Sequence, residues 1–361
     1  MKLFFDSSKM GLNGDYMRKP IVLITGANGR LGKSIIKRFG DAFTIIATDN
    51  EEPHEVQQEN YFQMDITSDE MVDDCLEKIR EKFGDEIDSV IHLVAYYSFG
   101  DQDWKKYQDI TIEGTKRLIL SLKKKIQVKQ FIFSSTLLVY EPCQKGEKIN
   151  ENSPLRPEWE YPKSKVISEK ILYEENEDVH LVIFRIAGCY DDYCNSIPIS
   201  QQIKRINENE MRKNFFSGDI NSGSPFLHLD DLADAFFSAV QKRNELPHEV
   251  VMILGEPNSY SYDFLQRQLG KLILKKEFAT YSIPKFLAKA VVWIENQLPF
   301  YPKPFIQPWM IDISDAHYDI DVSLAKELLD WTPKRDVAKT LPLMVQALKK
   351  DPVQWYKDHK L

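Results

Sequence analysis

The sequence predicts a doubly wound α/β fold of the Rossmann type, with a parallel sheet and a smaller C-terminal substrate lobe. Short apolar runs rich in β-branched residues alternate with amphipathic helical patterns over the first 190 residues, as in consecutive βαβ units. A glycine-rich loop joins the first strand pattern to the first helix pattern, and an acidic residue ends the second strand pattern. Both features are typical of sheets that bind a ligand at the carboxyl ends of their strands.

The predicted elements follow one another at the intervals of a parallel sheet. Strand patterns occupy 20–25, 43–50, 61–69, 88–98, 129–140 and 181–190, and helix patterns occupy 30–40, 71–84 and 114–125. After about residue 188 the alternation weakens, and prolines become frequent between 299 and 308. We expect this later part of the chain to form the smaller lobe over the carboxyl edge of the sheet, where ligands of such folds bind.

Composition excludes several classes of protein. Of the 361 residues, 43% are hydrophobic and 28% are charged, an ordinary globular balance, and the formal net charge is −8. Lysines and arginines are scattered, apart from Lys123–Lys125, so we expect no nucleic-acid partner. The four cysteines show no disulfide framework, which favours a reducing, cytoplasmic location, although the spacing of Cys189 and Cys194 would permit a bridge.

Two segments need to be checked as possible targeting or membrane-spanning sequences. Residues 1–18 lack the long apolar run of a signal peptide and are expected to form a loosely ordered leader. Residues 283–300 are apolar but carry three charged side chains and are too short to span a membrane. We therefore expect no membrane span.

The loop "TGANGRLG" spaces three glycines as GxxGxxG. Gly26 permits a tight turn, Gly29 leaves room for a pyrophosphate, and Gly32 lets the following helix pack closely on the strand. The helix start then offers free N–H groups and the positive end of its dipole to an anion. Small residues also serve ordinary βα turns, so the loop predicts a dinucleotide site because it lies directly between a strand and a helix.

Acidic residues follow the second and third strand patterns. Asp49 stands where a carboxylate would accept the adenosine ribose hydroxyls and repel the 2′-phosphate of NADP, so it predicts NAD as the cofactor. Asp65 closes the third strand pattern. It is a candidate for contact with the adenine amino group or, equally, for the cap of the helix that begins near Ser68.

The segment "YPKSK" places a phenol and an ammonium one helical turn apart. Tyr161 and Lys165 share one helix face, and Pro162 suits the first turn of a helix. A lysine near a phenol favours the phenolate, which accepts a hydroxyl proton while hydride leaves the same carbon. Alone, this pair would fit an exposed helix equally well. The strand pattern "FIFSST", which ends at Thr136 with three successive hydroxyls facing the crevice, favours a catalytic site.

The chain resembles an extended short-chain dehydrogenase/reductase, the group that includes the NAD-dependent epimerase/dehydratase family. The matching motifs, in the family's order over about residues 20–240, are "TGANGRLG", "ATDN", "MDI", "VIHLVA", "EGT", "FIFSSTLLVY", "YPKSK" and "FLHLDDLADAF". The tail "YDIDVSLAKELLDWTP" resembles the family's C-terminal segment. The resemblance implies that Tyr161 is the general base, that Lys165 binds the nicotinamide ribose and lowers the tyrosine pKa, and that Thr136 holds the reacting oxygen.

The resemblance also implies which residues meet the cofactor and the substrate. The expected NAD contacts are Gly26, Asn28, Gly29, Arg30, Leu31, Gly32, Asp49, Asn50, Asp65, Ile66, Leu93, Val94, Ala95, Ser134, Tyr161 and Lys165. The expected substrate contacts are Tyr97, Thr136, Gly188 and His228. His228 would also suit the core as a hydrogen-bonded histidine, and it has no second histidine at metal-ligand spacing, so we expect no metal.

Several positions depart from the family pattern around the expected substrate pocket. Leu137 and Leu138 stand where the family's 4,6-dehydratases carry an acid pair, which argues against dehydration by that route. Ser224 and Pro225 stand where sugar-nucleotide epimerases have an arginine that grips the diphosphate. Thr111 replaces an asparagine that often follows the fourth strand. These departures concern the substrate and leave the cofactor prediction unchanged.

We therefore predict an NAD-dependent oxidoreductase of the epimerase/dehydratase type, which moves hydride between nicotinamide and a secondary alcohol carbon of a sugar or sugar nucleotide. One alternative is a dehydrogenase of an apolar, sterol-like alcohol, with the aromatic segment 283–310 as its lid; that segment would equally form a packed helix. The other alternative is a non-catalytic NAD-binding sensor or scaffold.

The predicted domain organisation has three parts. They are a leader at 1–18, an NAD-binding domain at 19–190 and a mainly substrate-binding lobe at 191–361, some segments of which return to the core. The expected partners are a small-molecule substrate and a second copy of the chain.

Overall fold

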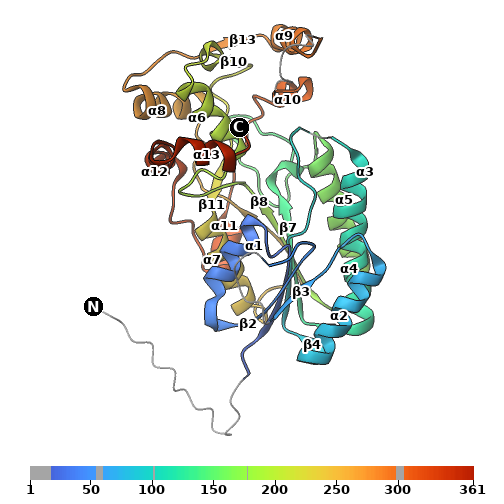
Figure 1. Ribbon diagram of the computed structural model, residues 1–361. Helices are drawn as coiled ribbons and strands as arrows, with labels where there is room; N and C mark the ends of the chain where they lie inside the picture. The colour runs from blue at the N-terminus through green and yellow to red at the C-terminus, as the bar shows by residue number, and fades with distance from the viewer. Residues whose placement is uncertain (1–17, 54–59, 101, 177, 298–304) are drawn as a thin grey trace, which may run out of the picture.

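A seven-stranded parallel sheet forms the centre of the computed structural model, which describes residues 18–53, 60–100, 102–176, 178–297 and 305–361 (Figure 1). Its strands are β1 (Ile21–Thr25), β2 (Thr44–Asp49), β3 (Tyr61–Gln63), β5 (Ser89–His92), β7 (Gln130–Thr136), β8 (His180–Ile186) and β12 (Glu249–Leu254). The spatial order β12–β8–β7–β5–β1–β2–β3 reverses direction between β1 and β5. That reversal is the switch point at which such sheets bind ligands. All but residue 18 of the predicted leader lies outside the described residues.

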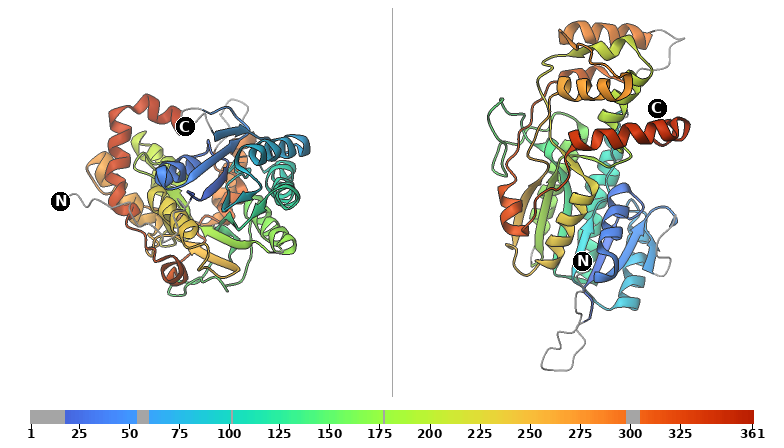
Figure 2. Two further views of the ribbon diagram at one scale, coloured as in Figure 1. Left: turned by 90° about the horizontal axis from the view of Figure 1, so that it is seen from below. Right: turned by 90° about the vertical axis from the view of Figure 1, so that its left-hand side faces the viewer.

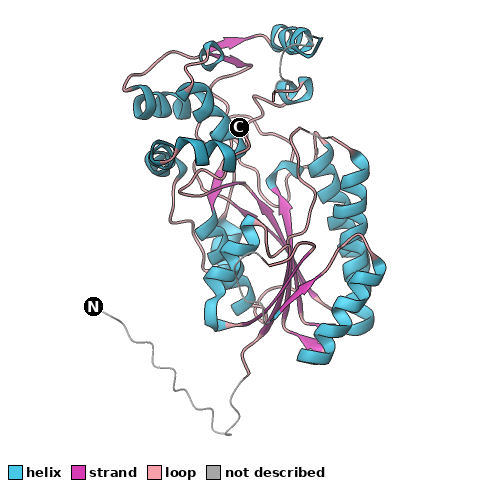
Figure 3. Ribbon diagram, viewed as in Figure 1, coloured by secondary structure: helices cyan, strands magenta, loops and turns pink. Residues whose placement is uncertain are grey.

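Helices cover both faces of the sheet, as the alternating patterns predicted (Figure 3). One face carries α1 (Arg30–Phe39), α7 (Leu229–Gln241) and α11 (Ser323–Leu329), and the other carries α2 (Asp69–Phe83), α4 (Glu113–Lys125) and α5 (Glu160–Glu175). Two large apolar clusters fill the layers between helices and sheet. Because the strands are covered on both sides, every residue of β1 and β7 is buried, which explains the apolar run Ile21–Ile24 of β1 and the apolar centre Phe131–Phe133 of β7.

Short elements connect these layers. They are η1 (Gly40–Ala42), β4 (Glu86–Ile87), α3 (Trp104–Lys106), the π-helical segment η3 (Tyr107–Ile112), β6 (Gln127–Val128) and η4 (Leu137–Val139). Thr111 lies in η3, where its Oγ1 accepts the Tyr96 N–H at 2.9 Å and its carbonyl accepts the Ser168 hydroxyl at 3.1 Å. The π-helical segment therefore ties the loop after β5 to α5, close to the carboxyl edge of the sheet.

The smaller lobe stands over the carboxyl ends of the strands (Figure 2, right). Its elements, with those that lead into it, are β9 (Gly188–Tyr190), α6 (Ile197–Asn207), η5 (Met211–Asn214), β10 (Phe215–Ser217), β11 (Phe226–His228), α8 (Tyr262–Leu274), β13 (Tyr281–Ile283), α9 (Lys285–Gln297), α10 (Pro308–Asp312), α12 (Val337–Lys350) and α13 (Pro352–Asp358). A third apolar cluster joins α6, α8 and α12. Among the described helices, none has the length and hydrophobicity to cross a bilayer.

The chain returns to the sheet after residue 190. Helices α7 and α11 pack on one face, and β12 forms an edge strand in which Val250 pairs with Val182 of β8. The core of the NAD-binding domain is therefore built from segments on both sides of residue 190. All four cysteines carry free thiols, so Cys189 and Cys194 form no bridge.

Candidate active site

The glycine loop joins β1 to α1 at the carboxyl edge of the sheet. Gly26 has a φ of +75°, a conformation that favours glycine, and a Cβ on Gly32 would lie 2.5 Å from the Gly26 carbonyl oxygen. Gly29 is the N-cap of α1 and provides no side-chain cap, and the first turn contains no acidic residue. This helix start therefore suits the diphosphate of a dinucleotide, because its N–H groups and dipole attract an anion.

Asp49 is fixed beside this loop. Its Oδ2 accepts the N–H of Asn28 at 2.9 Å, and its Oδ1 accepts the N–H of Asn50 at 2.9 Å. The Asn28 side chain donates to the Tyr61 hydroxyl at 3.0 Å, and Arg30 donates to the Asn195 carbonyl at 3.1 Å. The Asp49 carboxylate thus lies at the end of β2, the strand next to β1 and its glycine loop, where the two hydroxyls of the adenosine ribose would fit.

The third strand is shorter than the sequence pattern suggested. It ends at Gln63, two residues before Asp65, so the prediction that Asp65 closes the strand is corrected. One oxygen of Asp65 accepts the N–H of Thr67 at 2.8 Å, and the cap of α2 is Ser68, which accepts the N–H of Met71 at 3.2 Å. Asp65 is therefore not the helix cap, and its contact with adenine stays a prediction.

Two other predicted cofactor contacts differ in accessibility. Ile66 is buried, and a Cβ on Gly114 would lie 2.9 Å from its side chain, so only the backbone of Ile66 suits a ligand. The segment Leu93–Ala95 follows β5 at the switch point, and a Cβ on Gly26 would lie 3.3 Å from the Val94 nitrogen. This segment therefore closely approaches the glycine loop, and its contact with the cofactor stays a prediction.

Lys165 links the start of α5 to the end of β7. Its side chain is buried, its Nζ donates to the carbonyl of Ser134 at 2.6 Å, and it lies 5.9 Å from the centre of the Tyr161 ring. Burial lowers the pKa of Lys165 to about 7, against the opposing charge of Glu169. The hydroxyl of Ser134 donates to the His92 carbonyl at 3.0 Å, so the bond to the lysine uses the backbone of Ser134.

Tyr161 lies in the first turn of α5, as the proline that follows it predicted. Burial raises the pKa of Tyr161 above its ordinary value, and the Cys189 thiol and Tyr107 add to the rise. Desolvation disfavours the charged phenolate at this position. The expectation that Lys165 lowers the pKa of Tyr161 stays a prediction.

Thr136 ends β7, the strand whose carbonyl at Ser134 holds the lysine. Its Oγ1 accepts the N–H of Leu138 at 3.3 Å and thereby caps the turn η4. A cavity of about 120 Å³ begins beside this turn. It is lined by Leu138, Glu158, Trp159, Ser224, Ile313, Ser314, Ala316 and Tyr318. The cavity connects the end of β7, the entry to α5 and the smaller lobe.

The predicted substrate residues divide into two groups. Tyr97 is brought to the site, with its ring centre 4.7 Å from that of Tyr161. His228 is buried, its Nδ1 accepts the N–H of Asp230 at 3.0 Å as the cap of α7, and its Nε2 lies 3.4 Å from the Asp192 carboxylate. These contacts favour the structural interpretation of His228. Gly188 is exposed in β9, and its role stays a prediction.

An aromatic wall stands beside Tyr161. Its members are Tyr97, Phe99, Trp159, Phe305 and Trp309. The ring of Trp159 stacks at 5.3 Å on Phe99 and at 5.0 Å on Trp309, which lies in α10. The sequence singled out 283–310 as aromatic, but nothing local indicated that Phe99 and Trp159 would join it. Offset and stacked rings at these distances form a continuous apolar surface.

A buried ion pair lies one turn beyond Lys165, and sequence reasoning missed it. Arg185 of β8 donates to Glu169 through Nη2 at 2.6 Å and Nε at 3.2 Å, and its Nη1 donates to the Tyr140 hydroxyl at 2.8 Å. The Ser135 hydroxyl also donates to Glu169. The sequence did contain an indication of this pair, because an arginine within the apolar strand "LVIFRI" requires a buried partner of opposite charge.

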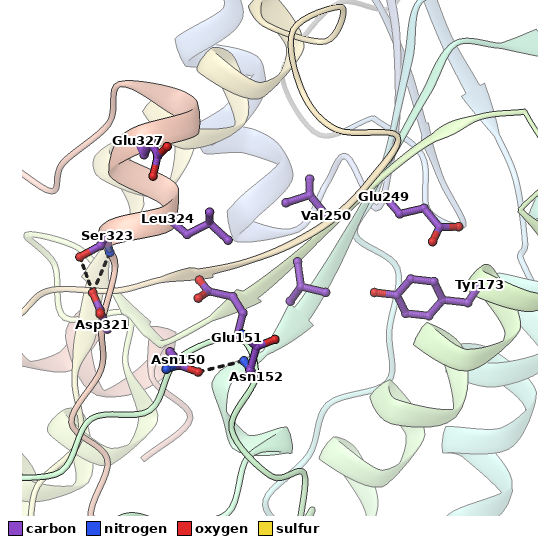
Figure 4. A pocket seen from close by; sticks show the side chains of 11 residues that line it. Asn150, Glu151, Asn152, Tyr173, Glu249, Val250, Asp321, Ser323, Leu324 and Glu327 are labelled. Carbon is purple, nitrogen blue, oxygen red and sulfur yellow. Dashed lines mark hydrogen bonds between the residues drawn. The ribbon is translucent and has the colours of Figure 1, made fainter.

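A larger hollow lies away from this site (Figure 4). It measures about 570 Å³ and is bordered by the edge strand β12, α5 and α11, with Glu151, Glu249, Asp321 and Glu327 among its lining residues. Local groups engage three of these carboxylates: Glu151 accepts the N–H of Ile253, Glu249 accepts a bond from the Asn176 side chain, and Asp321 accepts the N–H and the hydroxyl of Ser323. Within the described ranges, no three metal-ligating side chains gather into a cluster. The hollow is therefore not the candidate site.

The parallel sheet and the glycine loop at its switch point are those of a Rossmann-type, dinucleotide-binding protein. The chain belongs to the NAD dependent epimerase/dehydratase family, whose model matches residues 22–255. The glycine loop and Asp49 fit the cofactor of this family, because they pair an uncapped helix start with a fixed carboxylate at the neighbouring strand end.

Relatives with different substrates match the chain at similar levels. Sterol-4-alpha-carboxylate 3-dehydrogenase ERG26, decarboxylating, from Saccharomyces cerevisiae is 24% identical over 364 residues, covering 91% of this chain and 98% of that protein. UDP-glucuronate 4-epimerase from Thermodesulfobacterium geofontis is 26% identical over 312 residues, covering 83% and 80%. The chain spans only 33% of the bifunctional polymyxin resistance protein ArnA from Wigglesworthia glossinidia brevipalpis, with 25% identity over 231 residues that make up 59% of this chain.

Solved structures confirm the fold. MoeE5 in complex with UDP-glucose and NAD superposes with a TM-score of 0.69 at 18% identity, covering 92% of this chain and 99% of that chain. At this identity the likeness concerns the fold, and the family membership supplies NAD as the cofactor.

Proposed function

We propose that the chain is an NAD-dependent oxidoreductase that acts on a secondary alcohol carbon, with Tyr161 as the general base. One observation carries the proposal: Lys165 bonds to the carbonyl of Ser134 near the end of β7 while its ammonium lies 5.9 Å from the centre of the Tyr161 ring. This contact ties the helix turn that carries Tyr161 to the strand that ends at Thr136, so the two segments form one structural unit. A sensor or scaffold that only binds NAD would not require this unit.

The proposed chemistry assigns one task to each residue. When bound, NAD supplies the nicotinamide ring that accepts a hydride from the carbinol carbon. Thr136 donates a hydrogen bond to the substrate oxygen, and Tyr161 removes the hydroxyl proton as the C–H bond breaks and the carbonyl forms. Lys165 stabilises the phenolate through its positive charge, and the reduction of a ketone uses the same steps in reverse.

The geometry favours an alcohol with an apolar body. The aromatic wall borders Tyr161, and Phe305 and Trp309 bring the segment 283–310 to the site as the lid interpretation requires. Leu138, Ile313 and Ala316 add apolar surface to the adjoining cavity. The hydroxyl of Ser314 in that cavity lies 2.7 Å from the carbonyl oxygen of Ser217 and 2.9 Å from that of Ile311, so its single proton is already engaged.

A sugar nucleotide is the second candidate substrate. The family membership and the UDP-glucuronate 4-epimerase relative support it. Aromatic rings also stack on nucleotide bases, so the wall would accommodate such a substrate. Ser224, which lines the cavity at the position where an arginine would grip a diphosphate, argues against it.

A substrate screen tests the proposal. Turnover is measured with NAD and, in turn, 3β-hydroxysterols, smaller apolar secondary alcohols, UDP-glucose and UDP-glucuronate. NADH formation with an apolar alcohol is the expected result. Interconversion of a sugar nucleotide without net NADH would establish the second candidate, and NAD binding without turnover of any substrate would favour the sensor.

The cofactor preference is a separate prediction that depends on Asp49. We expect the protein to bind NAD about tenfold or more tightly than NADP, because a carboxylate at the end of β2 repels a 2′-phosphate. Asp49→Asn should narrow this ratio by about tenfold. Isothermal titration with both dinucleotides measures the ratio, with Asp41→Asn in η1, which precedes β2, as the control. Tighter binding of NADP by the unmodified protein would contradict the prediction.

A further inference from the structure

The cavity beside η4 adjoins both hydroxyls of the proposed chemistry. Leu138 lines it, and the N–H of this residue donates to Thr136 Oγ1 at 3.3 Å. Trp159 lines it as well, and the centre of its ring lies 5.5 Å from that of Tyr161. A substrate whose reacting alcohol stands between Thr136 and Tyr161 would therefore extend into this cavity.

Tyr318 brings an unengaged hydroxyl to the cavity. The residue lines the cavity and is only 4% exposed. Its backbone is fixed, because its N–H donates to the Gly223 carbonyl at 3.0 Å and its carbonyl accepts the Ser259 hydroxyl at 2.6 Å. Within the described residues the phenol hydroxyl has no hydrogen-bond partner, and its oxygen is not sealed off by neighbouring atoms. A buried phenol normally has a partner, so this hydroxyl is available to an occupant of the cavity.

Glu158 presents a carboxylate with one free oxygen. Arg156 donates to its Oε1 through Nε and Nη2, each at 3.0 Å, whereas Oε2 accepts no bond from the part of the chain that the structure describes. The carboxylate acts on Tyr318, since burial raises the pKa of that phenol and the charge on Glu158 adds to the rise. The Arg156 side chain is 62% exposed and holds Glu158 from the solvent side.

The described residues that line the cavity offer hydrogen bonds but no positive charge. Among them Glu158 is the one charged side chain, and Ser224 adds a second hydroxyl for which the described residues supply no partner. The lysine nearest in sequence on the lobe side, Lys285, is already paired with Asp315. An anionic group in this cavity would thus meet a carboxylate without a lining cation, which is unfavourable in a partly buried site.

We propose that this cavity recognises a second, uncharged hydroxyl group of the substrate and rejects an anionic group in its place. The inference rests on the proposed function, because the reacting alcohol must stand between Thr136 and Tyr161. The free oxygen of Glu158 accepts the proton of the second hydroxyl, and the hydroxyls of Tyr318 and Ser224 donate to its oxygen. The substrate is then amphipathic, with an apolar body against the aromatic wall and a polar group at this end.

Three matched alcohols test the proposal on the unmodified chain. They are cyclohexanol, 4-(hydroxymethyl)cyclohexanol and 4-hydroxycyclohexanecarboxylate, which share the reacting carbinol and differ in hydrogen bonding and charge. Tryptophan fluorescence of the NAD-saturated protein measures their binding, and absorbance measures NADH formation. We expect the hydroxymethyl compound to bind about tenfold more tightly than cyclohexanol, and the carboxylate about tenfold or more weakly than the hydroxymethyl compound.

Two conservative variants assign these preferences to residues. Tyr318→Phe should lower the preference for the hydroxymethyl compound over cyclohexanol by about tenfold, because it removes one hydrogen-bonding group from a buried position. Glu158→Gln should narrow the discrimination against the carboxylate by about tenfold, because it removes the charge and keeps the size. Glu141→Gln is the matched control: Glu141 also accepts a bond from Arg156 but is not among the described lining residues, so the ratios should not change. Circular dichroism melts verify that each variant folds.

The two readouts separate this inference from the proposed function. Graded binding of the three alcohols without NADH formation would refute the oxidoreductase assignment and support the specificity of the cavity. Equal binding of all three, or no binding of any at its solubility limit, would overturn the inference. Equal effects of Glu158→Gln and Glu141→Gln would also overturn it, because the charge would then act through Arg156 and not within the cavity.

Discussion

Replacing Tyr161 by phenylalanine should lower kcat by about 10³-fold, while NAD binding stays within about twofold of that of the unmodified protein. The substitution removes one hydroxyl and retains the ring, which contacts Tyr97 and Trp159. The packing at the start of α5 is therefore preserved. The loss should fall on the chemical step, because the phenol is the group that removes the hydroxyl proton.

A tyrosine on the same helix supplies the control. Tyr173→Phe lies two turns beyond Lys165, faces the larger hollow and should leave kcat unchanged. Single-turnover measurements with the best substrate of the screen separate the chemical step from product release. If Tyr161→Phe retains the turnover of the unmodified protein, the assignment of the general base is wrong, even if the protein proves to be an oxidoreductase.

The parts of the fold that depend on local sequence were predictable. The strand before the glycine loop, β1, is buried on both faces and is apolar from Ile21 to Ile24, and Gly26 and Gly32 meet backbone constraints within the loop itself. Tyr161 and Lys165 are one helical turn apart, so a single helix places them. These features require no knowledge of how distant segments meet.

The features that sequence reasoning missed depend on tertiary contacts. Phe99, Trp159 and Trp309 come from three separate segments, and only the docking of the smaller lobe stacks their rings. The rise in the pKa of Tyr161 likewise follows from burial, which no spacing of residues reveals. The aromatic segment 283–310 was recognised, but the face of α9 that packs on the lobe depends on contacts of Ala288 and Val292 with Ile311, which lies in a separate helix.

The buried pair of Glu169 and Arg185 should dominate the stability of the site. Arg185→Leu is expected to lower the free energy of unfolding by about 3–5 kcal/mol, because it leaves the Glu169 carboxylate buried without its principal partner. Glu169→Leu should have a similar effect through the uncompensated arginine. An exposed pair provides the contrast: Asp109→Asn removes a solvent-accessible bond to Lys105 and should leave stability unchanged within error.

The double variant Glu169→Leu with Arg185→Leu distinguishes pairing from packing. If each single loss reflects an isolated buried charge, removing both charges should recover about half or more of the lost stability. Denaturant unfolding of the four proteins gives the coupling energy, and strictly additive losses would show that the two side chains act through packing alone.

Glu169→Gln adds a functional readout, because the carboxylate raises the pKa of Lys165, which burial has lowered to about 7. Its loss should shift that pKa further down, so the lysine loses its charge at a lower pH. The activity of Glu169→Gln relative to the unmodified protein should therefore be lower at pH 7.5 than at pH 6, on either side of a pKa of about 7.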